Sequence, residues 1–129
     1  IKMLLDKDVE LLKAIPLFSK IDPRKLKLIA FTAKRTVYKP QEIIFKKGDP
    51  GHDVLILLEG KANATLPGNN TNITITVHQG EIAGEVSVLC GTPRMVTLTA
   101  DSAVTVLSLE KDLFTKLLKE IPDLAVQIV

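Results

Sequence analysis

A short stretch of this chain carries residue types that can bind a phosphate group beside a hydroxyl. Arg94 supplies a fixed cation, and Glu85 supplies a carboxylate that can accept a hydrogen bond from a hydroxyl. Gly84 allows the backbone a tight approach, and one short helical turn after it would direct unpaired N–H groups at an anion. A molecule with one phosphate next to a ribose hydroxyl would use all of these groups together. The pattern therefore indicates a site for a nucleotide monophosphate.

Each of these residues has an ordinary explanation when it is taken alone. Gly84 by itself is most often a turn glycine, and Glu85 by itself is most often a solvated carboxylate. Ser87 strengthens the combination, because its small side chain lets its backbone N–H approach a phosphate that a bulky residue would crowd. A buried Arg94 without an anionic partner would be costly, which favours a bound ligand. We therefore interpret the four residues as one binding set.

The segment resembles the phosphate-binding cassette of the cyclic nucleotide-binding domain family. The family pattern has Gly-Glu, a small residue and apolar residues, followed after a short spacer by Arg, and residues 84–94 fit it closely. Three other segments look like landmarks of the same family and occur in the expected order. They are residues 15–19, 43–49 and 54–60, so the resemblance covers nearly the whole chain.

The resemblance implies a role for each cassette residue. Arg94 would bind the exocyclic phosphate oxygens, and Glu85 would bind the ribose 2′-hydroxyl. The backbone N–H groups of Ser87 and Met95 would complete the phosphate site. The residues that the resemblance places at the ligand are Gly84, Glu85, Val86, Ser87, Arg94 and Met95.

The expected choice of base depends on Met95. Many family members carry Ala, Ser or Thr here, and in members that favour the guanine nucleotide a Thr hydroxyl contacts the guanine amino group. Methionine cannot make that hydrogen bond, so cyclic AMP (cAMP) is the expected regulatory ligand, with cyclic GMP (cGMP) as the alternative. Val77 and Ile82 could contact the base, although core filling is the more frequent role of such residues.

The spacing of apolar residues along the sequence predicts the helices and strands that position these residues. Apolar residues at helical spacing predict a helix that ends at Pro16, a helix from Asp22 to about Ala33, a helix over 111–119, and the start of another at 123–129. Segments rich in β-branched residues, separated by Gly, Pro, Asn and Asp, predict strands between the second and third helices. The predicted strands are residues 36–38, 42–45, 53–58, 61–66, 72–77, 95–100 and 103–109.

Many short strands at this spacing indicate a mainly β protein, a jelly-roll barrel with flanking helices and a short cassette helix. The 129 residues fit one domain. N-terminal helices would occupy residues 1–34, the barrel 35–109 with the cassette at 84–97, and C-terminal helices 110–129. Residues 73–77 alternate cleanly between apolar and polar side chains, so one face of this strand is expected to meet a core.

The composition argues against several kinds of partner. The 17 basic and 15 acidic residues leave a net charge of +2 and no dense Lys/Arg stripe, so this segment is not expected to bind nucleic acid. Cys90 is the only cysteine, which excludes an intrachain disulfide and favours a cytoplasmic location. The longest apolar run, residues 54–58, is too short to cross a membrane. Ile1 in place of Met suggests a piece of a longer protein.

The sequence leaves three functions open, and the first two keep the fold of the cyclic nucleotide-binding domain. In the first, a regulatory switch, ligand capture would draw the cassette inward and change how the helices at 113–118 and 123–129 pack on the barrel. An effector outside this chain would receive the signal, and in the family such effectors are kinases, exchange factors, ion channels and transcription factors. The second is an interaction module without a ligand, which the presence of both Glu85 and Arg94 disfavours.

The third function is a metal enzyme of the cupin type. A metal site needs three or four convergent ligands, and His52 and His78 are isolated in the sequence with no His-x-His pair. Ser87 and Cys90 have no sequence context typical of a nucleophile. We therefore expect neither catalysis nor a cofactor or metal.

Overall fold

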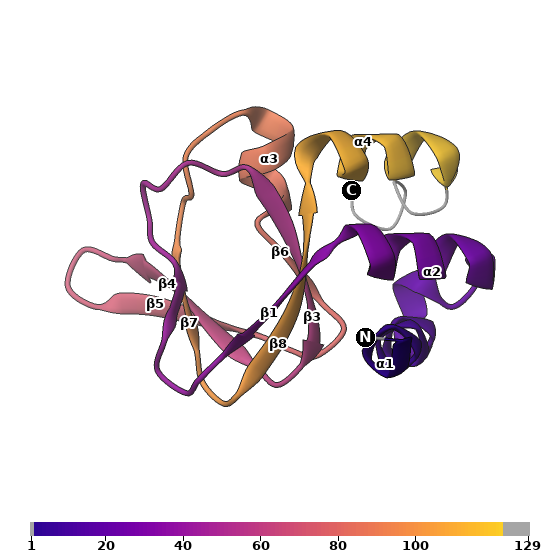
Figure 1. The fold of residues 1–129 in the computed structure, drawn as a ribbon. Coiled ribbons are helices and arrows are strands. Elements are labelled where there is room, and N and C mark those ends of the chain that lie inside the picture. The colour runs from indigo at the N-terminus through magenta and orange to yellow at the C-terminus, as the bar shows by residue number, and fades with distance from the viewer. Residues whose placement is uncertain (1, 123–129) are drawn as a thin grey trace.

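Two four-stranded antiparallel sheets form the centre of the molecule (Figure 1). The computed structural model of this chain describes residues 2–122. The first sheet has the strand order β1-β8-β3-β6, and the second has the order β2-β7-β4-β5. In chain order the strands are β1 (Lys34–Tyr38), β2 (Ile43–Phe45), β3 (Asp53–Glu59), β4 (Ala62–Pro67), β5 (Asn72–Val77), β6 (Ile82–Ala83), β7 (Thr97–Ala100) and β8 (Val104–Glu110).

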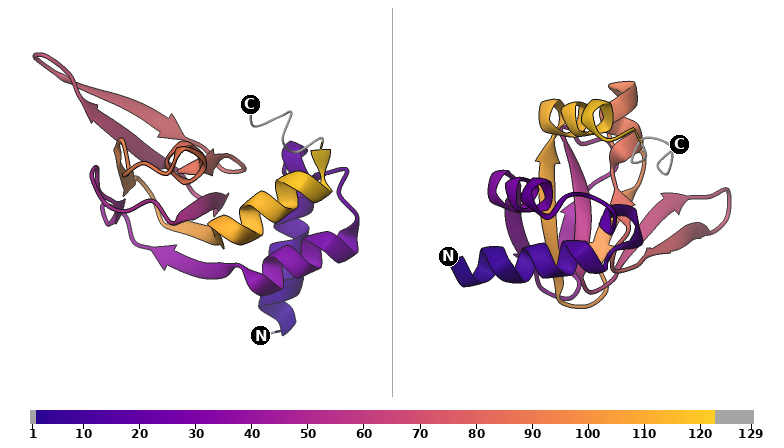
Figure 2. Two further views of the ribbon diagram at one scale, coloured as in Figure 1. Left: turned by 90° about the horizontal axis from the view of Figure 1, so that it is seen from above. Right: turned by 90° about the vertical axis from the view of Figure 1, so that its right-hand side faces the viewer.

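Helices cover the outer face of the first sheet. Figures 1 and 2 show α1, α2 and α4 together on this side, with α3 at one end of the sandwich. Leu12, Leu26 and Phe114 from these helices are almost completely buried in one core together with Ile56 of β3. The described helices are α1 (Lys2–Ala14), the 3-10 helix η1 (Pro16–Phe18), α2 (Pro23–Thr32), α3 (Glu85–Cys90) and α4 (Lys111–Glu120).

Strand β3 is buried on both faces because its sheet is the middle layer. Leu55 and Leu57 belong to the core between the sheets, whereas Val54, Ile56 and Leu58 belong to the core under the helices. A strand that is buried on both faces has a continuous apolar sequence in place of an alternating one. This explains why the most apolar run of the chain is also its central strand.

The start of α2 follows from its sequence. The Asp22 side chain caps the helix by accepting a hydrogen bond from the N–H of Arg24 at 2.9 Å, and Pro23 occupies the first turn. This backbone hydrogen bond holds the pKa of Asp22 below its ordinary value. The predicted cap of this helix is confirmed.

The hairpin of β4 and β5 projects from the sandwich (Figure 2). Its alternating sequence predicted a core under one face of β5, and for most of the strand this is wrong. Ile73 and Ile75 are 52% and 64% exposed, and only Val77 packs against the core between the sheets. The reason is topological, because β5 is an edge strand and reaches beyond the opposite sheet.

The predicted fold class is confirmed as a sandwich of two antiparallel sheets with flanking helices. Each predicted strand is present. β5 has the predicted bounds, and the others have shifted ends; β7 begins at Thr97 instead of Met95. The two-residue β6 and the three-residue η1 were not predicted. The helix predicted for 123–129 lies outside the described residues. Within residues 2–122, no helix is both long and apolar enough to cross a membrane.

Candidate functional site

Gly84 joins β6 to α3 at the start of the predicted cassette. Its φ of +85° lies in the left-handed region, which residues with a side chain rarely adopt. A Cβ atom there would collide with Nη1 of Arg94 and lie 3.3 Å from the carbonyl oxygen of Asp53. Glycine is therefore required twice, by the backbone conformation and by the close approach of the guanidinium group.

Arg94 lies buried between this turn and the start of β3, with 6% of its surface exposed. Its Nη1 donates hydrogen bonds to the carbonyl oxygen of Gly84 at 3.1 Å and to Oγ of Ser87 at 2.9 Å. Its Nη2 donates to the carbonyl oxygen of Asp53 at 2.7 Å. The Ser87 hydroxyl is also buried and donates to the carbonyl oxygen of Gly84 at 3.1 Å. The guanidinium group thus links the cassette to β3.

The charge of Arg94 has no counter-ion among residues 2–122. No carboxylate in that range lies within 4.0 Å of the guanidinium group, and Nε is buried without a hydrogen-bond partner. Burial lowers the pKa of Arg94, and the negative charges of Asp53 and Asp49 oppose this without cancelling it. A buried cation whose hydrogen-bond partners are all neutral oxygen atoms is costly, so this arrangement favours the arrival of an anion.

Phe45 lies against the same guanidinium group, with Cζ of Arg94 over its ring. The ring centroid lies 4.4 Å from Cζ of Arg94, within the range of a cation–π interaction. Phe45 ends β2, pairs with Leu98 of β7 and packs against the core between the sheets. The pairing of β2 with β7 therefore brings Phe45 next to Arg94, which lies just before β7.

The loop between β2 and β3 fixes the backbone around the site. The N–H of Arg94 donates to the carbonyl oxygen of Asp49, and the N–H of Gly48 donates to the carbonyl oxygen of Arg94, both at 2.8 Å. Gly51 lies so close to α3 that a Cβ atom there would collide with Oγ of Ser87. This loop therefore sets the positions of both Arg94 and Ser87.

A hollow of about 320 Å³ opens at these residues. It combines the cation, the ring of Phe45 and the first turn of α3. Val86 and Met95 border it and are 51% and 58% exposed. Six of the eight predicted site residues line this hollow. The full lining is Phe45, Gly84, Glu85, Val86, Ser87, Arg94, Met95 and Val96.

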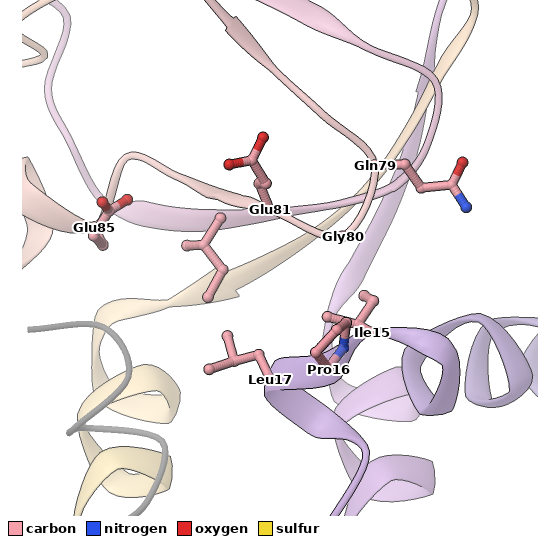
Figure 3. Close-up of a pocket in the computed structure, with 8 residues that line it drawn as sticks. Ile15, Pro16, Leu17, Gln79, Gly80, Glu81 and Glu85 are labelled. Carbon is pink, nitrogen blue, oxygen red and sulfur yellow. The ribbon is translucent and has the colours of Figure 1, made fainter.

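The other two predicted residues lie elsewhere. Ile82 packs in the core under the helices and Val77 in the core between the sheets, and neither lines the hollow at Arg94. Ile82 instead lines a second hollow of about 450 Å³, between η1 and residues 79–82 (Figure 3). Half-buried Glu85 borders both hollows. Its carboxylate lies more than 4.0 Å from the guanidinium nitrogen atoms of Arg94 and forms no ion pair with them.

The histidines do not line the hollow at Arg94. His52 and His78 are both exposed, and the carbonyl oxygen of His52 accepts a hydrogen bond from the N–H of Lys111 at 3.2 Å. Across residues 2–122, no three His, Cys, Asp or Glu side chains come together as metal ligands would. The described residues thus offer no cluster suited to metal chemistry.

Sequence reasoning missed several residues that build the site. Phe45, Gly51 and Asp53 were placed in predicted elements or loops, but their contacts with Arg94 and Ser87 cross long stretches of sequence. The resemblance marked residues 43–49 and 54–60 as landmarks without giving them a role at the site. The presence of an aromatic residue within residues 43–49 was the only available signal for Phe45.

Comparisons with known proteins give a consistent result. The family described as the cyclic nucleotide-binding domain matches residues 35–121. A cAMP-dependent protein kinase regulatory subunit of Colletotrichum orbiculare is 33% identical over 109 residues, covering 84% of this chain and 28% of that protein. The cyclic nucleotide-gated channel beta-3 of Canis lupus familiaris is 25% identical over 121 residues, covering 92% of this chain and 16% of that protein.

A solved structure of PKAR CBD2 bound to Sp-2Cl-cAMPS has a TM-score of 0.79 and 28% identity, covering 98% of this chain and 84% of that one. The chain spans less than a third of the length of the two curated relatives. Its two sheets, its cassette turn and the family match over most of its length agree with one another. This chain belongs to the cyclic nucleotide-binding domain family.

Proposed function

We propose that this domain binds cAMP as a regulatory ligand, with the cyclic phosphate at Arg94. The observation that carries this proposal is the buried guanidinium group of Arg94, which lines a hollow of about 320 Å³. Its hydrogen-bond partners among residues 2–122 are all neutral oxygen atoms. A phosphate would supply the missing negative charge through charge-assisted hydrogen bonds. Helical geometry also leaves the first N–H groups of α3 free for the phosphate oxygens.

Glu85 is the proposed partner of the ribose. It begins α3, is half-buried and lines the same hollow as Arg94. The Glu85 carboxylate makes no ion pair with Arg94, so it is free to accept a hydrogen bond from the 2′-hydroxyl. Gly84, Ser87 and Met95 complete the proposed contacts through their backbone.

The preference for cAMP over cGMP rests on Met95. Its side chain borders the hollow and cannot offer a hydroxyl to a guanine amino group. The names of the relatives support the same choice, since one is a cAMP-dependent kinase subunit and one solved structure holds a cAMP analogue. For Val77 and Ile82 we propose core filling, because neither lines this hollow.

The proposed output is regulatory and not catalytic. Ligand capture would change the packing of α4 on the first sheet, and an effector outside this chain would respond. The relatives include a kinase regulatory subunit and an ion channel, so the class of effector follows from the rest of the protein. We retain a cytoplasmic location as part of the proposal, based on the single, exposed Cys90.

Calorimetric titration with cAMP tests the proposal against the alternative of a module without a ligand. Arg94→Ala should weaken binding by about thirty-fold to several-thousand-fold, because loss of one partner of a desolvated charge pair costs about 2–5 kcal/mol. Arg24→Ala is the matched control, since the Arg24 side chain is 93% exposed on α2 and should leave affinity unchanged. Circular dichroism would establish that both variants fold. A wild-type protein that binds no cyclic nucleotide would support the ligand-free module.

A further inference from the structure

We propose that Phe45 is a positioning residue for cyclic-nucleotide binding, acting through the guanidinium group of Arg94. This inference rests on the proposed function, and it concerns how the protein stabilises an arginine that has no carboxylate partner in the described residues. Cζ of Arg94 lies over the ring of Phe45, 4.4 Å from the ring centroid. Phe45 also lines the hollow that we assign to the ligand.

The geometry separates two sets of contacts on Arg94. Hydrogen bonds use the edge of a planar guanidinium group, and here they run from Nη1 and Nη2 to oxygen atoms of Gly84, Ser87 and Asp53. The ring of Phe45 carries no oxygen or nitrogen acceptor and attracts the cation through the quadrupole of its face. Phe45 can therefore hold the orientation of Arg94 without competing with a phosphate for its N–H groups.

The choice of an aromatic ring also affects the charge of the site. A carboxylate beside Arg94 would hold the guanidinium group equally well, but it would neutralise the charge that attracts the phosphate. A ring stabilises the cation through its quadrupole and excludes water from one face, while the net positive charge remains. We infer that this is why a buried arginine with neutral partners can persist before the ligand arrives.

The position of Phe45 is fixed by the second sheet. It pairs with Leu98 of β7, and the register of β2 shifts between Ile43 and Phe45. The ring packs against the core between the sheets, next to the hollow. Leucine at residue 45 would fill much of this space and keep the strand apolar, but it could not make a cation–π contact with Arg94. If Phe45 acts only by packing, Phe45→Leu should leave the affinity for cAMP nearly unchanged, whereas an action on Arg94 predicts that the affinity falls.

Fluorinated phenylalanines at residue 45 test the inference most sharply. Mono-, di- and trifluoro-phenylalanine keep the shape of the ring but withdraw electron density from its face, so the attraction to a cation falls with each fluorine. We expect the dissociation constant for cAMP to rise stepwise along this series, and Phe45→Leu to weaken binding by about two- to thirty-fold. The same series at Phe31, which is 74% exposed on α2, is the matched control.

A measurement without ligand separates an effect on Arg94 from direct contact between the ring and the nucleotide. In the free protein, hydrogen exchange of the Arg94 Nε–H, followed by NMR, should become faster along the fluorinated series at residue 45. The inference is overturned if affinity is equal across the series, or if affinity falls while the exchange rate in the free protein stays constant. If wild-type protein binds no cyclic nucleotide, the proposed function itself fails, whatever the exchange rates are.

Discussion

At the scale of single residues, Arg94 is stabilised by three neutral oxygen atoms and one aromatic ring, without a protein carboxylate within 4.0 Å in residues 2–122. Two opposite charges 4 Å apart attract by about 4 kcal/mol at an effective dielectric constant near 20. A bound phosphate would gain an interaction of this order with Arg94. Arg94 in the free protein can make this interaction with a phosphate, because it forms no ion pair with a carboxylate among residues 2–122.

The role of Glu85 can be isolated with a modified ligand. Glu85→Ala should weaken cAMP binding by about ten- to hundred-fold, the usual effect of losing a hydrogen bond to a charged group. Glu85→Gln should cost less than Arg94→Ala, because an amide still accepts one hydrogen bond from a hydroxyl. The measurement is calorimetry with cAMP and 2′-deoxy-cAMP, with Glu10→Ala as a control on an exposed face of α1.

The two ligands and the wild-type and Glu85→Ala proteins form a double-mutant cycle. Removal of the 2′-hydroxyl should weaken binding to wild type but have little further effect on Glu85→Ala. Losses that simply add would show that Glu85 and the 2′-hydroxyl do not touch.

Base preference provides a second test at the residue scale. Met95→Thr should raise affinity for cGMP relative to cAMP by about two- to ten-fold, because one recovered hydrogen bond contributes about 0.5–1.5 kcal/mol. Competition binding with both nucleotides on both proteins measures this ratio. A ratio that stays constant, or that moves toward cAMP, would remove Met95 from the explanation of specificity.

At the scale of elements, the turn between β6 and α3 positions the phosphate site. Gly84→Ala should weaken cAMP binding by about ten- to hundred-fold, because its Cβ would displace the guanidinium group of Arg94 and its charge-assisted hydrogen bond. Gly91→Ala is the matched control. Gly91 also has a positive φ, +68°, but a Cβ there meets nothing within 4 Å. Equal losses of affinity in the two variants would mean that backbone strain, and not the collision, disturbs the site.

Most elements could be predicted because their sequences carry a clear period or a clear boundary. The apolar run of β3 and the Asp22-Pro23 start of α2 are examples. The two-residue β6 is too short to show any period. β7 starts later than predicted because residues 95 and 96 form a bend between Arg94, whose backbone bonds to the loop between β2 and β3, and the strand.

The site was predictable where its residues are close in sequence. Gly84, Glu85, Ser87 and Arg94 lie within one segment, and the structure gathers them around one hollow. Phe45 could not be assigned to Arg94 in the same way. Its contact with Arg94 depends on the pairing of β2 with β7, which are far apart in the sequence, and no local pattern encodes that pairing.

At the scale of the whole molecule, the start of β3 connects the site to α4. The carbonyl oxygen of Asp53, at the start of β3, accepts a hydrogen bond from Arg94, and the neighbouring residue His52 accepts one from Lys111 at the start of α4. Ile56 further along β3 packs under the helices. A change at Arg94 therefore has a short physical route to α4.

This route predicts a measurable response of α4. Saturating cAMP should change the amide hydrogen-exchange rates of residues 111–120, because the ligand binds the two packing arrangements of α4 with different affinity. Residues 62–77 in the projecting hairpin should not change and are the internal control. Arg94→Ala should abolish the response at the same cAMP concentration. A response confined to residues 84–95 would contradict the proposed relay while leaving ligand binding intact.

A crystal structure of this domain with cAMP tests the central claim most directly. We predict that the cyclic phosphate occupies the hollow beside α3, with an oxygen atom about 2.7–2.9 Å from a guanidinium nitrogen of Arg94. The ribose 2′-hydroxyl should lie within hydrogen-bond distance of the Glu85 carboxylate. A nucleotide bound elsewhere, or bound with its phosphate turned away from Arg94, would contradict the account.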